Sequence, residues 1–142
     1  MIIFKIFLIF LFISKCEARR FFFILNKYYI GVKGSISCRF PTNDVALLAI
    51  TVNPRNTYER RPIAHAKVKY GKSFSLLGKI YRITRPKFYL RIVHSCVKSN
   101  FMNNMSFVVK TYVEEISSNY IVQNYWSGKF YNRGNIELSR IR

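Results

Sequence analysis

The segment from Phe88 to Cys96 alternates between two sets of side chains, and it constrains the fold more than any other stretch of the chain. One set is an apolar series that ends in a histidine and a cysteine: Phe88, Leu90, Ile92, His94 and Cys96. Because side chains in a strand point to opposite faces with a period of two, this pattern predicts a half-buried β-strand. The buried face of that strand ends in a thiol, which needs either a partner or a place in the core.

Apolar stretches between turn residues predict several more short strands. Val45–Val52 is apolar on both faces, and its β-branched end before Asn53-Pro54 favours a central strand over a buried helical turn. Ser73–Gly78 predicts a strand that ends at the glycine, which makes residues 79–87 a basic connector. No stretch has the spacing of an amphipathic helix. The other predicted strands are 29–39, 64–70, 107–113 and 134–138.

This number and spacing of short strands is typical of an all-β fold. We predict an antiparallel β-sandwich of about seven strands, with a small barrel as the alternative.

The N-terminal residues have the pattern of a secretory signal peptide. Residues 2–13 are apolar apart from Lys5, and a small residue, Ala18, precedes two arginines. The apolar stretch is shorter than the about 20 residues that a membrane span needs. An uncleaved anchor that continues through Phe21–Leu25 would place charged residues in hydrocarbon. We therefore expect a signal peptide at 1–18, a lead-in at 19–28 and one domain at 29–142, with no transmembrane span in the mature chain.

The mature chain keeps two of the three cysteines, because Cys16 lies in the expected signal peptide. Cys38 shares a face of its predicted strand with Val32 and Ile36, as Cys96 does with the aliphatic residues of its own strand. An even number of cysteines in an oxidising compartment favours a Cys38–Cys96 disulfide over two free buried thiols. On the chain-entropy model such a bridge contributes roughly 4 kcal/mol.

The chain is strongly basic, with 24 Lys and Arg against 6 Asp and Glu. In a secreted protein, the expected partners of such charge are anionic glycans, acidic lipid head groups or acidic proteins, and nucleic acid is not expected. The alternative is a diffuse positive surface that only aids solubility. Smaller basic groups are Arg55, Arg60 and Arg61 in one loop and Lys67 and Lys69 on one strand face. The candidate site for an anionic partner is the densest group, Lys79, Arg82, Arg85, Lys87 and Arg91.

Several pieces of the chain, taken in order, resemble the nematode transthyretin-like family of secreted proteins. The first two are the signal peptide and Gly34–Cys38. Ser73–Gly78 is similar to the family motif G-x-F-x-L-x-G, and Pro86–Cys96 is similar to P-x-L-x-I-x-H-x-C. The last is Gly134–Leu138, which is similar to G-x-I/L-x-L. The resemblance implies a secreted β-sandwich of the transthyretin-like (Ig-like or prealbumin-like) type, placed outside the cell or at its surface. The biochemical role of the family is mostly unassigned.

Catalytic and metal chemistry are not expected. A transthyretin-like hydrolase of 5-hydroxyisourate needs clustered His and Arg and ends in Tyr-Arg-Gly-Ser, whereas this chain has two His and only an internal Tyr131-Asn132-Arg133-Gly134. Two His and two oxidised Cys do not make a closed zinc site. We expect His94 to be a neutral histidine that hydrogen-bonds a nearby backbone group. His65 has no second ligand within reach in the sequence. The prediction is therefore a non-enzymatic protein with no cofactor.

Two surface features complete the candidates. Asn104-Met105-Ser106 is an acceptor sequence for N-glycosylation on a predicted loop. The aromatic residues at 21–23, 120, 125 and 126 form either an exposed binding patch or, for most of them, part of the core.

The functional prediction is a secreted binding module for an anionic partner or surface. A carrier of a small apolar ligand is the alternative, and it needs an oligomer with a channel between facing sheets. A hydrolase is the least favoured.

Overall fold

The computed structural model describes residues 5–6, 25–40, 44–55, 61–97 and 108–140. Most of the expected signal peptide, most of the lead-in and Asn104 lie outside these residues. In the part that is described, no helix has the length and hydropathy that a membrane crossing requires. The strands are β1 (Asn26–Ser37), β2 (Val45–Thr51), β3 (Ala64–Lys69), β4 (Ser73–Arg82), β5 (Phe88–His94), β6 (Lys110–Ile116), β7 (Val122–Gln123) and β8 (Phe130–Glu137), with two 3₁₀ turns, η2 (Ser118–Tyr120) and η3 (Leu138–Arg140).

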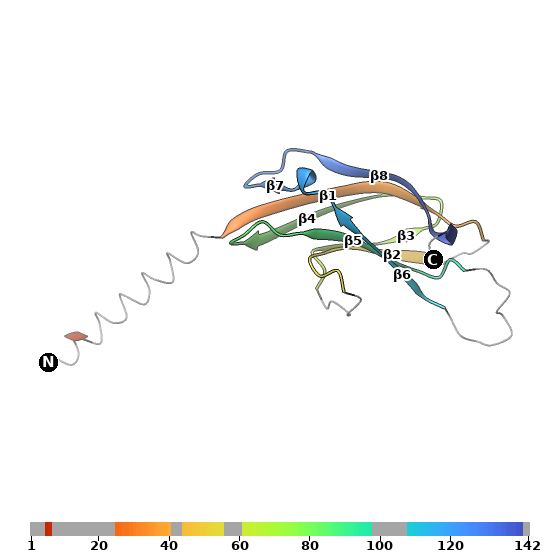
Figure 1. Cartoon of the computed structure of the whole chain (residues 1–142), viewed down its shortest axis with the longest axis horizontal. Coiled ribbons are helices and arrows are strands. Elements are labelled where there is room, and N and C mark those ends of the chain that lie inside the picture. Colours follow the sequence, from red (N-terminus) through yellow and green to blue (C-terminus); the bar gives the residue numbers. More distant parts are fainter. Residues whose placement is uncertain (1–4, 7–24, 41–43, 56–60, 98–107, 141–142) are drawn as a thin grey trace.

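The strands form two four-stranded sheets that lie over one another (Figure 1). One sheet has the order β4-β1-β7, with β8 also paired to β1, and the other has the order β3-β2-β5-β6. The predicted all-β sandwich is therefore confirmed. One detail differs: β8 pairs with β1 in parallel, with a register shift between Lys33 and Gly34, so the first sheet is mixed rather than purely antiparallel.

The alternation predicted for the central segment is confirmed by its burial. Phe88, Leu90 and Ile92 on β5 are fully buried, and their neighbours are partly exposed. They face apolar residues of β1 across the core, since Ile30 and Val32 are also fully buried. Burial of a large aliphatic side chain contributes about 1.5–3 kcal/mol, so these inner faces hold the two sheets together.

Several predicted boundaries are wrong. The strand expected at 107–113 is β6 (Lys110–Ile116), and the one expected at 134–138 is β8 (Phe130–Glu137). The strand that begins at Ser73 does not end at Gly78 but continues to Arg82, and it pairs with β1 along its whole length. A Cβ at Gly78 would lie 2.7 Å from Cγ2 of Ile63, so this glycine makes room for a packed neighbour and does not form a turn. β1 also begins earlier than expected, at Asn26, because it pairs with this extension of β4.

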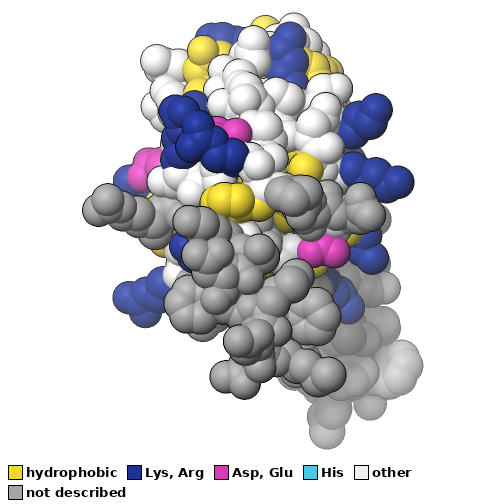
Figure 2. Space-filling model, turned by 90° about the vertical axis from the view of Figure 1, so that its right-hand side faces the viewer, with side chains coloured by type: hydrophobic (Ala, Val, Ile, Leu, Met, Phe, Trp, Pro, Cys, Tyr) yellow, Lys and Arg dark blue, Asp and Glu magenta, His cyan; other side chains and the backbone are white. Residues whose placement is uncertain are grey.

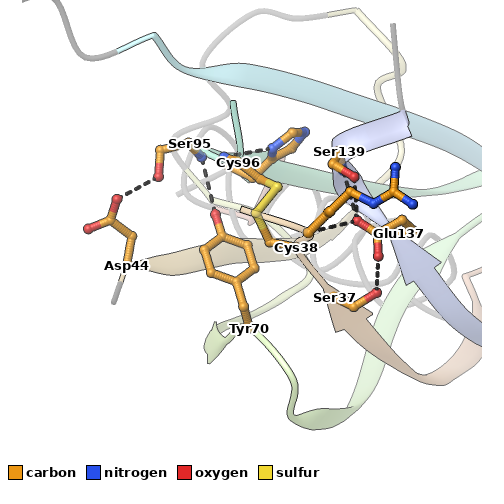
Figure 3. Close-up of a disulfide and its surroundings, with 10 residues drawn as sticks. Ser37, Cys38, Asp44, Tyr70, Ser95, Cys96, Glu137 and Ser139 are labelled. Carbon is orange, nitrogen blue, oxygen red and sulfur yellow. Dashed lines mark hydrogen bonds between the residues drawn. A yellow bond between two sulfur atoms is a disulfide. The ribbon is translucent and has the colours of Figure 1, made fainter. Parts of the chain in front are cut away.

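The disulfide predicted between Cys38 and Cys96 is present and joins the two sheets at one end (Figure 3). Cys38 follows β1 and Cys96 follows β5, and their Cα atoms are 5.8 Å apart. His94 is 2% exposed beside the bridge, and its Nδ1 accepts a hydrogen bond from the backbone N–H of Cys96 at 3.2 Å. Burial, and then the charge of Lys110, lower the pKa of His94, as expected for a neutral core histidine.

Candidate functional site

The structure does not bring the five predicted basic residues into one surface. Lys79 and Arg82 lie on β4, whereas Arg91 lies on β5 in the other sheet. Lys79 is exposed next to buried Gly78, and Arg91 lies between buried Leu90 and Ile92. Lys79 and Arg91 therefore point away from the core on opposite sides of the sandwich. The candidate site of five clustered residues must be corrected, because nearness in sequence across a strand–strand connection does not make a shared face.

Arg85 and Lys87 both make polar contacts within the chain. Nη2 of Arg85 donates hydrogen bonds to the carbonyl oxygens of Ser118, at 2.7 Å, and of Ile121, at 2.8 Å, so it ties the β4–β5 connection to η2. Nζ of Lys87 lies 3.3 Å from the Glu115 carboxylate, with both side chains more than half exposed. An exposed pair of this kind contributes little to stability, but it lowers the positive charge that Lys87 offers to a partner.

Positive charge is also spread over the rest of the molecule. Figure 2 shows Lys and Arg side chains on both sides of the view and not gathered at one place. Lys67 and Lys69 are exposed on β3, as are Arg55 and Arg61 in the neighbouring loops, and Arg60 lies outside the described residues. Charge alone therefore does not identify a site, and a second chemical feature is needed.

That feature is found on the outer face of the sheet that contains β1 and β4. Lys27, Tyr29 and Lys33 alternate with the buried residues of β1, so they point away from the core. β4 adds two neighbours from the adjacent strand, because Lys79 pairs with Tyr29 and Tyr81 pairs with Lys27. We call the following set the basic-aromatic face: Lys27, Tyr29, Lys33, Lys79, Tyr81, Trp126 and Phe130.

Gly31 allows aromatic side chains to approach the sheet closely at the centre of this face. A Cβ at this position would lie 2.5 Å from Cη2 of Trp126 and 2.8 Å from Cδ1 of Phe130. The rings of Trp126 and Phe130 meet edge to face with centroids 5.2 Å apart, and the Tyr29 ring is 6.5 Å from Trp126. This absence of a side chain on β1 is what lets the segment after β7 fold back over the strand.

Two lysines of the face, Lys27 and Lys33, lie beside its aromatic rings. Nζ of Lys27 is 5.9 Å from the ring centroid of Tyr29 and 5.5 Å from that of Tyr81, and Nζ of Lys33 is 5.9 Å from that of Phe130. These are distances at which a cation is attracted to an aromatic ring. Hydrogen bonding with Tyr29 raises the pKa of Lys27 above its ordinary 10.5, so this side chain stays charged at neutral pH.

None of the described carboxylates pairs with the lysines of this face. The acidic residue on the same sheet is Glu137, near the disulfide, and it accepts hydrogen bonds from the Ser37 hydroxyl at 2.8 Å and from the backbone N–H of Arg39 at 3.2 Å (Figure 3). The Ser139 hydroxyl donates a further hydrogen bond to it at 2.6 Å. Glu137 is thus satisfied at one end of the sheet, and no described carboxylate neutralises the ammonium groups of the face.

The face continues into an open hollow with a volume of about 670 Å³. It begins at Lys33 and runs between β4, β1 and β8. Its lining carries hydroxyl and amide groups, and two of these bond each other, since Ser35 Oγ donates to Asn135 Oδ1 at 3.1 Å. The side chains with such groups are Ser35, Ser73, Ser75, Asn132 and Asn135.

A separate polar cluster joins the open edges of the two sheets. Glu114 on β6 accepts hydrogen bonds from Nε of Arg133, at 2.5 Å, and from the Tyr131 hydroxyl, at 2.6 Å, both on β8. The Tyr112 hydroxyl donates a third. Burial alone would raise the pKa of Glu114, but the hydrogen bonds from the two tyrosines and Arg133 more than offset this and lower it. The hydrogen bond that the Tyr131 hydroxyl donates to Glu114 raises the pKa of Tyr131 to about 12.

The remaining predicted residues are placed as follows. Tyr125 is 70% exposed and Trp126 covers Gly31, whereas Tyr120 packs edge-on against Tyr131 with ring centroids 5.2 Å apart. Residues 21–23 lie outside the described residues. His65 is exposed on β3, and in the described part of the chain no three or more His, Cys, Asp or Glu residues come together.

Reasoning from the sequence missed the basic-aromatic face, although a signal for it was present. Lys27, Tyr29 and Lys33 occupy alternate positions of the same strand as the buried Ile30 and Val32. The alternation marks them as outward-facing, but it does not show that Trp126 and Phe130 return to cover that strand. Comparison with known proteins finds no matching family model, no similar curated protein and no similar solved structure.

Proposed function

We propose that this chain is a secreted, non-enzymatic binding module with a transthyretin-like β-sandwich, acting outside the cell on an anionic partner. The N-terminal pattern of a signal peptide and the inter-sheet disulfide support an extracellular location, because disulfides persist in oxidising compartments. The transthyretin-like assignment is supported by the motifs that resemble that family and by the two-sheet architecture.

One observation carries the proposal: the basic-aromatic face presents three lysines without a carboxylate partner among the described residues. Lys27, Lys33 and Lys79 project from two adjacent strands of one sheet. Their charges add to the field of a chain whose net charge is +18, which attracts anions over long distances. Complementary charge of this kind raises association rates and selects the partner.

The alternative of a carrier for a small apolar ligand receives no support from the hollow beside this face. Carrier sites enclose most of the ligand surface in a largely apolar cavity. The hollow is open to solvent, so it would not enclose a ligand in this way.

A matched pair of double variants tests the proposal. Lys33→Gln/Lys79→Gln removes two charges from the face, and Lys67→Gln/Lys69→Gln removes two from β3 on the opposite sheet. The purified proteins are passed over immobilised heparin, phosphatidylserine vesicles and polyglutamate at about 0.15 M salt. We expect at least one matrix to retain both the wild type and the Lys67→Gln/Lys69→Gln variant. The Lys33→Gln/Lys79→Gln variant should elute early from that same matrix. Equal behaviour of the two variants on all three matrices would show that the charge acts only diffusely.

A further inference from the structure

We infer that the anionic partner is an acidic polysaccharide, which lies along β1 with its sugar rings against the aromatic side chains and its anionic groups against the lysines. This inference rests on the proposed function and names the chemical class of the partner. It is drawn from three features of the basic-aromatic face: its rings, the hydroxyl and amide groups that line its hollow, and its length.

The rings supply what a purely electrostatic site would not need. An anionic lipid head group or an acidic peptide is satisfied by cations alone, whereas the carbon-bound hydrogens of a sugar ring form an apolar surface that packs against an aromatic face. Trp126 and Phe130 lie over Gly31, and Tyr81 is 51% exposed on the adjacent strand. Large aromatic side chains contribute strongly to the energetics of interfaces, and here they lie between the charged groups.

The hollow extends the same surface with groups suited to sugar hydroxyls. Ser35 lies beside Lys33 on β1, Ser75 pairs with Lys33 from β4, and Asn132 pairs with it from β8. Hydroxyl and amide groups both donate and accept hydrogen bonds, so they match a ligand rich in hydroxyls better than one with only anionic oxygens. Lys33 stands at the junction of the aromatic and the polar parts.

The length of the surface favours a polymer over a small anion. At about 3.3 Å per residue, the path along β1 from Lys27 to Ser35 is about 26 Å long. The lysines recur along it, because Lys79 pairs with Tyr29 and so lies about 7 Å along the strand from Lys27 and about 13 Å from Lys33. Repeated charges along an extended, open strip match a chain whose anionic groups recur at regular intervals.

Trp126 provides a direct test, because it is the sole tryptophan of the chain. Its fluorescence is measured while the protein is titrated with a heparin oligosaccharide, with inorganic polyphosphate of matched charge and with phosphatidylserine vesicles, at about 0.15 M salt. We expect the oligosaccharide to change the emission of Trp126 and to bind at least about tenfold more tightly than polyphosphate.

Two variants separate stacking from charge. Trp126→Leu keeps an apolar cover over Gly31 but removes the ring, and Tyr125→Leu changes the exposed neighbour outside the face. By calorimetry, the first should weaken oligosaccharide binding about tenfold and leave polyphosphate binding unchanged, and the second should alter neither.

The outcomes distinguish this inference from the proposed function. Equal binding of oligosaccharide and polyphosphate, tighter binding of the vesicles, or no effect of Trp126→Leu would overturn the polysaccharide and leave an anion-binding module. Failure to bind any of the three polyanions would overturn the proposed function itself.

Discussion

The Glu114 carboxylate on β6 accepts a hydrogen bond from Nε of Arg133 on β8 at 2.5 Å, and this contact joins the edge strands of two different sheets. Elsewhere the two sheets are held together by apolar packing and by the Cys38–Cys96 bridge, so this pair is a polar contact at the open side of the core. Both side chains are largely shielded from water, with 36% of Arg133 and 20% of Glu114 exposed.

We expect Glu114→Ala to lower the free energy of unfolding by about 1–3 kcal/mol, because it leaves Arg133 and two tyrosine hydroxyls without their acceptor. Glu115→Ala is the matched control, since its pair with Lys87 is exposed, and it should cost less than about 0.5 kcal/mol. Urea denaturation measures both. In a double-mutant cycle, the Glu114→Ala/Arg133→Ala variant should lose less free energy of unfolding than the sum of the losses of the two single variants. Additive losses would mean that the pair has no coupling.

Acidification should destabilise the protein in two steps. Burial and Lys110 lower the pKa of His94 below 6.5, so below about pH 6.5 the unfolded chain binds a proton that the folded chain does not. The free energy of unfolding then falls with pH, by at most about 1.4 kcal/mol per pH unit for this group. A second loss begins below about pH 4.5. Burial alone would raise the pKa of Glu114, but the hydrogen bonds that it accepts outweigh burial and lower its pKa. The pKa of Glu137 is lowered mainly by its hydrogen bond from Ser139.

His94→Gln isolates the first step, because it can still accept a hydrogen bond from the Cys96 N–H but does not titrate. Urea denaturation at a series of pH values between about 7.5 and 5.5 should show a decline for the wild type and a flat profile for the variant. A wild-type profile as flat as that of the variant would contradict the shift assigned to His94.

Removal of the inter-sheet bridge should be the most costly change of those considered. The disulfide closes a loop with a sequence separation of 58, for which the chain-entropy model predicts a loss of about 4 kcal/mol. Thermal unfolding of Cys38→Ala/Cys96→Ala, compared with the reduced and alkylated wild type, measures it. The two should agree closely, and a double variant as stable as the oxidised protein would show that packing alone holds this end of the sandwich.

Gly31→Ala should disturb the basic-aromatic face without changing its charge. The added methyl group would overlap the Trp126 and Phe130 rings, so we expect a red shift of the tryptophan emission as Trp126 moves toward solvent. The free energy of unfolding should fall by about 1–3 kcal/mol, the usual cost of overpacking. An unchanged emission spectrum would mean that Trp126 does not rest on Gly31 in solution.

Two features of the structure could be predicted from the sequence alone. The alternation from Phe88 to His94 determined a strand and its buried face, since a period of two can be read without knowing the neighbours. With Cys16 assigned to the expected signal peptide, the cysteine count left one pairing, Cys38–Cys96. Both inferences depend on local periodicity or on a small number of alternatives, and neither requires knowledge of which strands are adjacent.

Tertiary structure decided everything that depends on which strand lies beside which. Alternation shows that Lys79 and Arg91 point outward, but only the assignment of β4 and β5 to different sheets places them on opposite sides. Glycine is common where a strand ends, so the sequence predicted an end at Gly78. Pairing with β1 instead continues the strand through Gly78 to Arg82. Trp126 over Gly31 and Glu114 beside Arg133 are likewise contacts between segments distant in the sequence. Such contacts arise from the packing of whole strands, and no local pattern of residues encodes them.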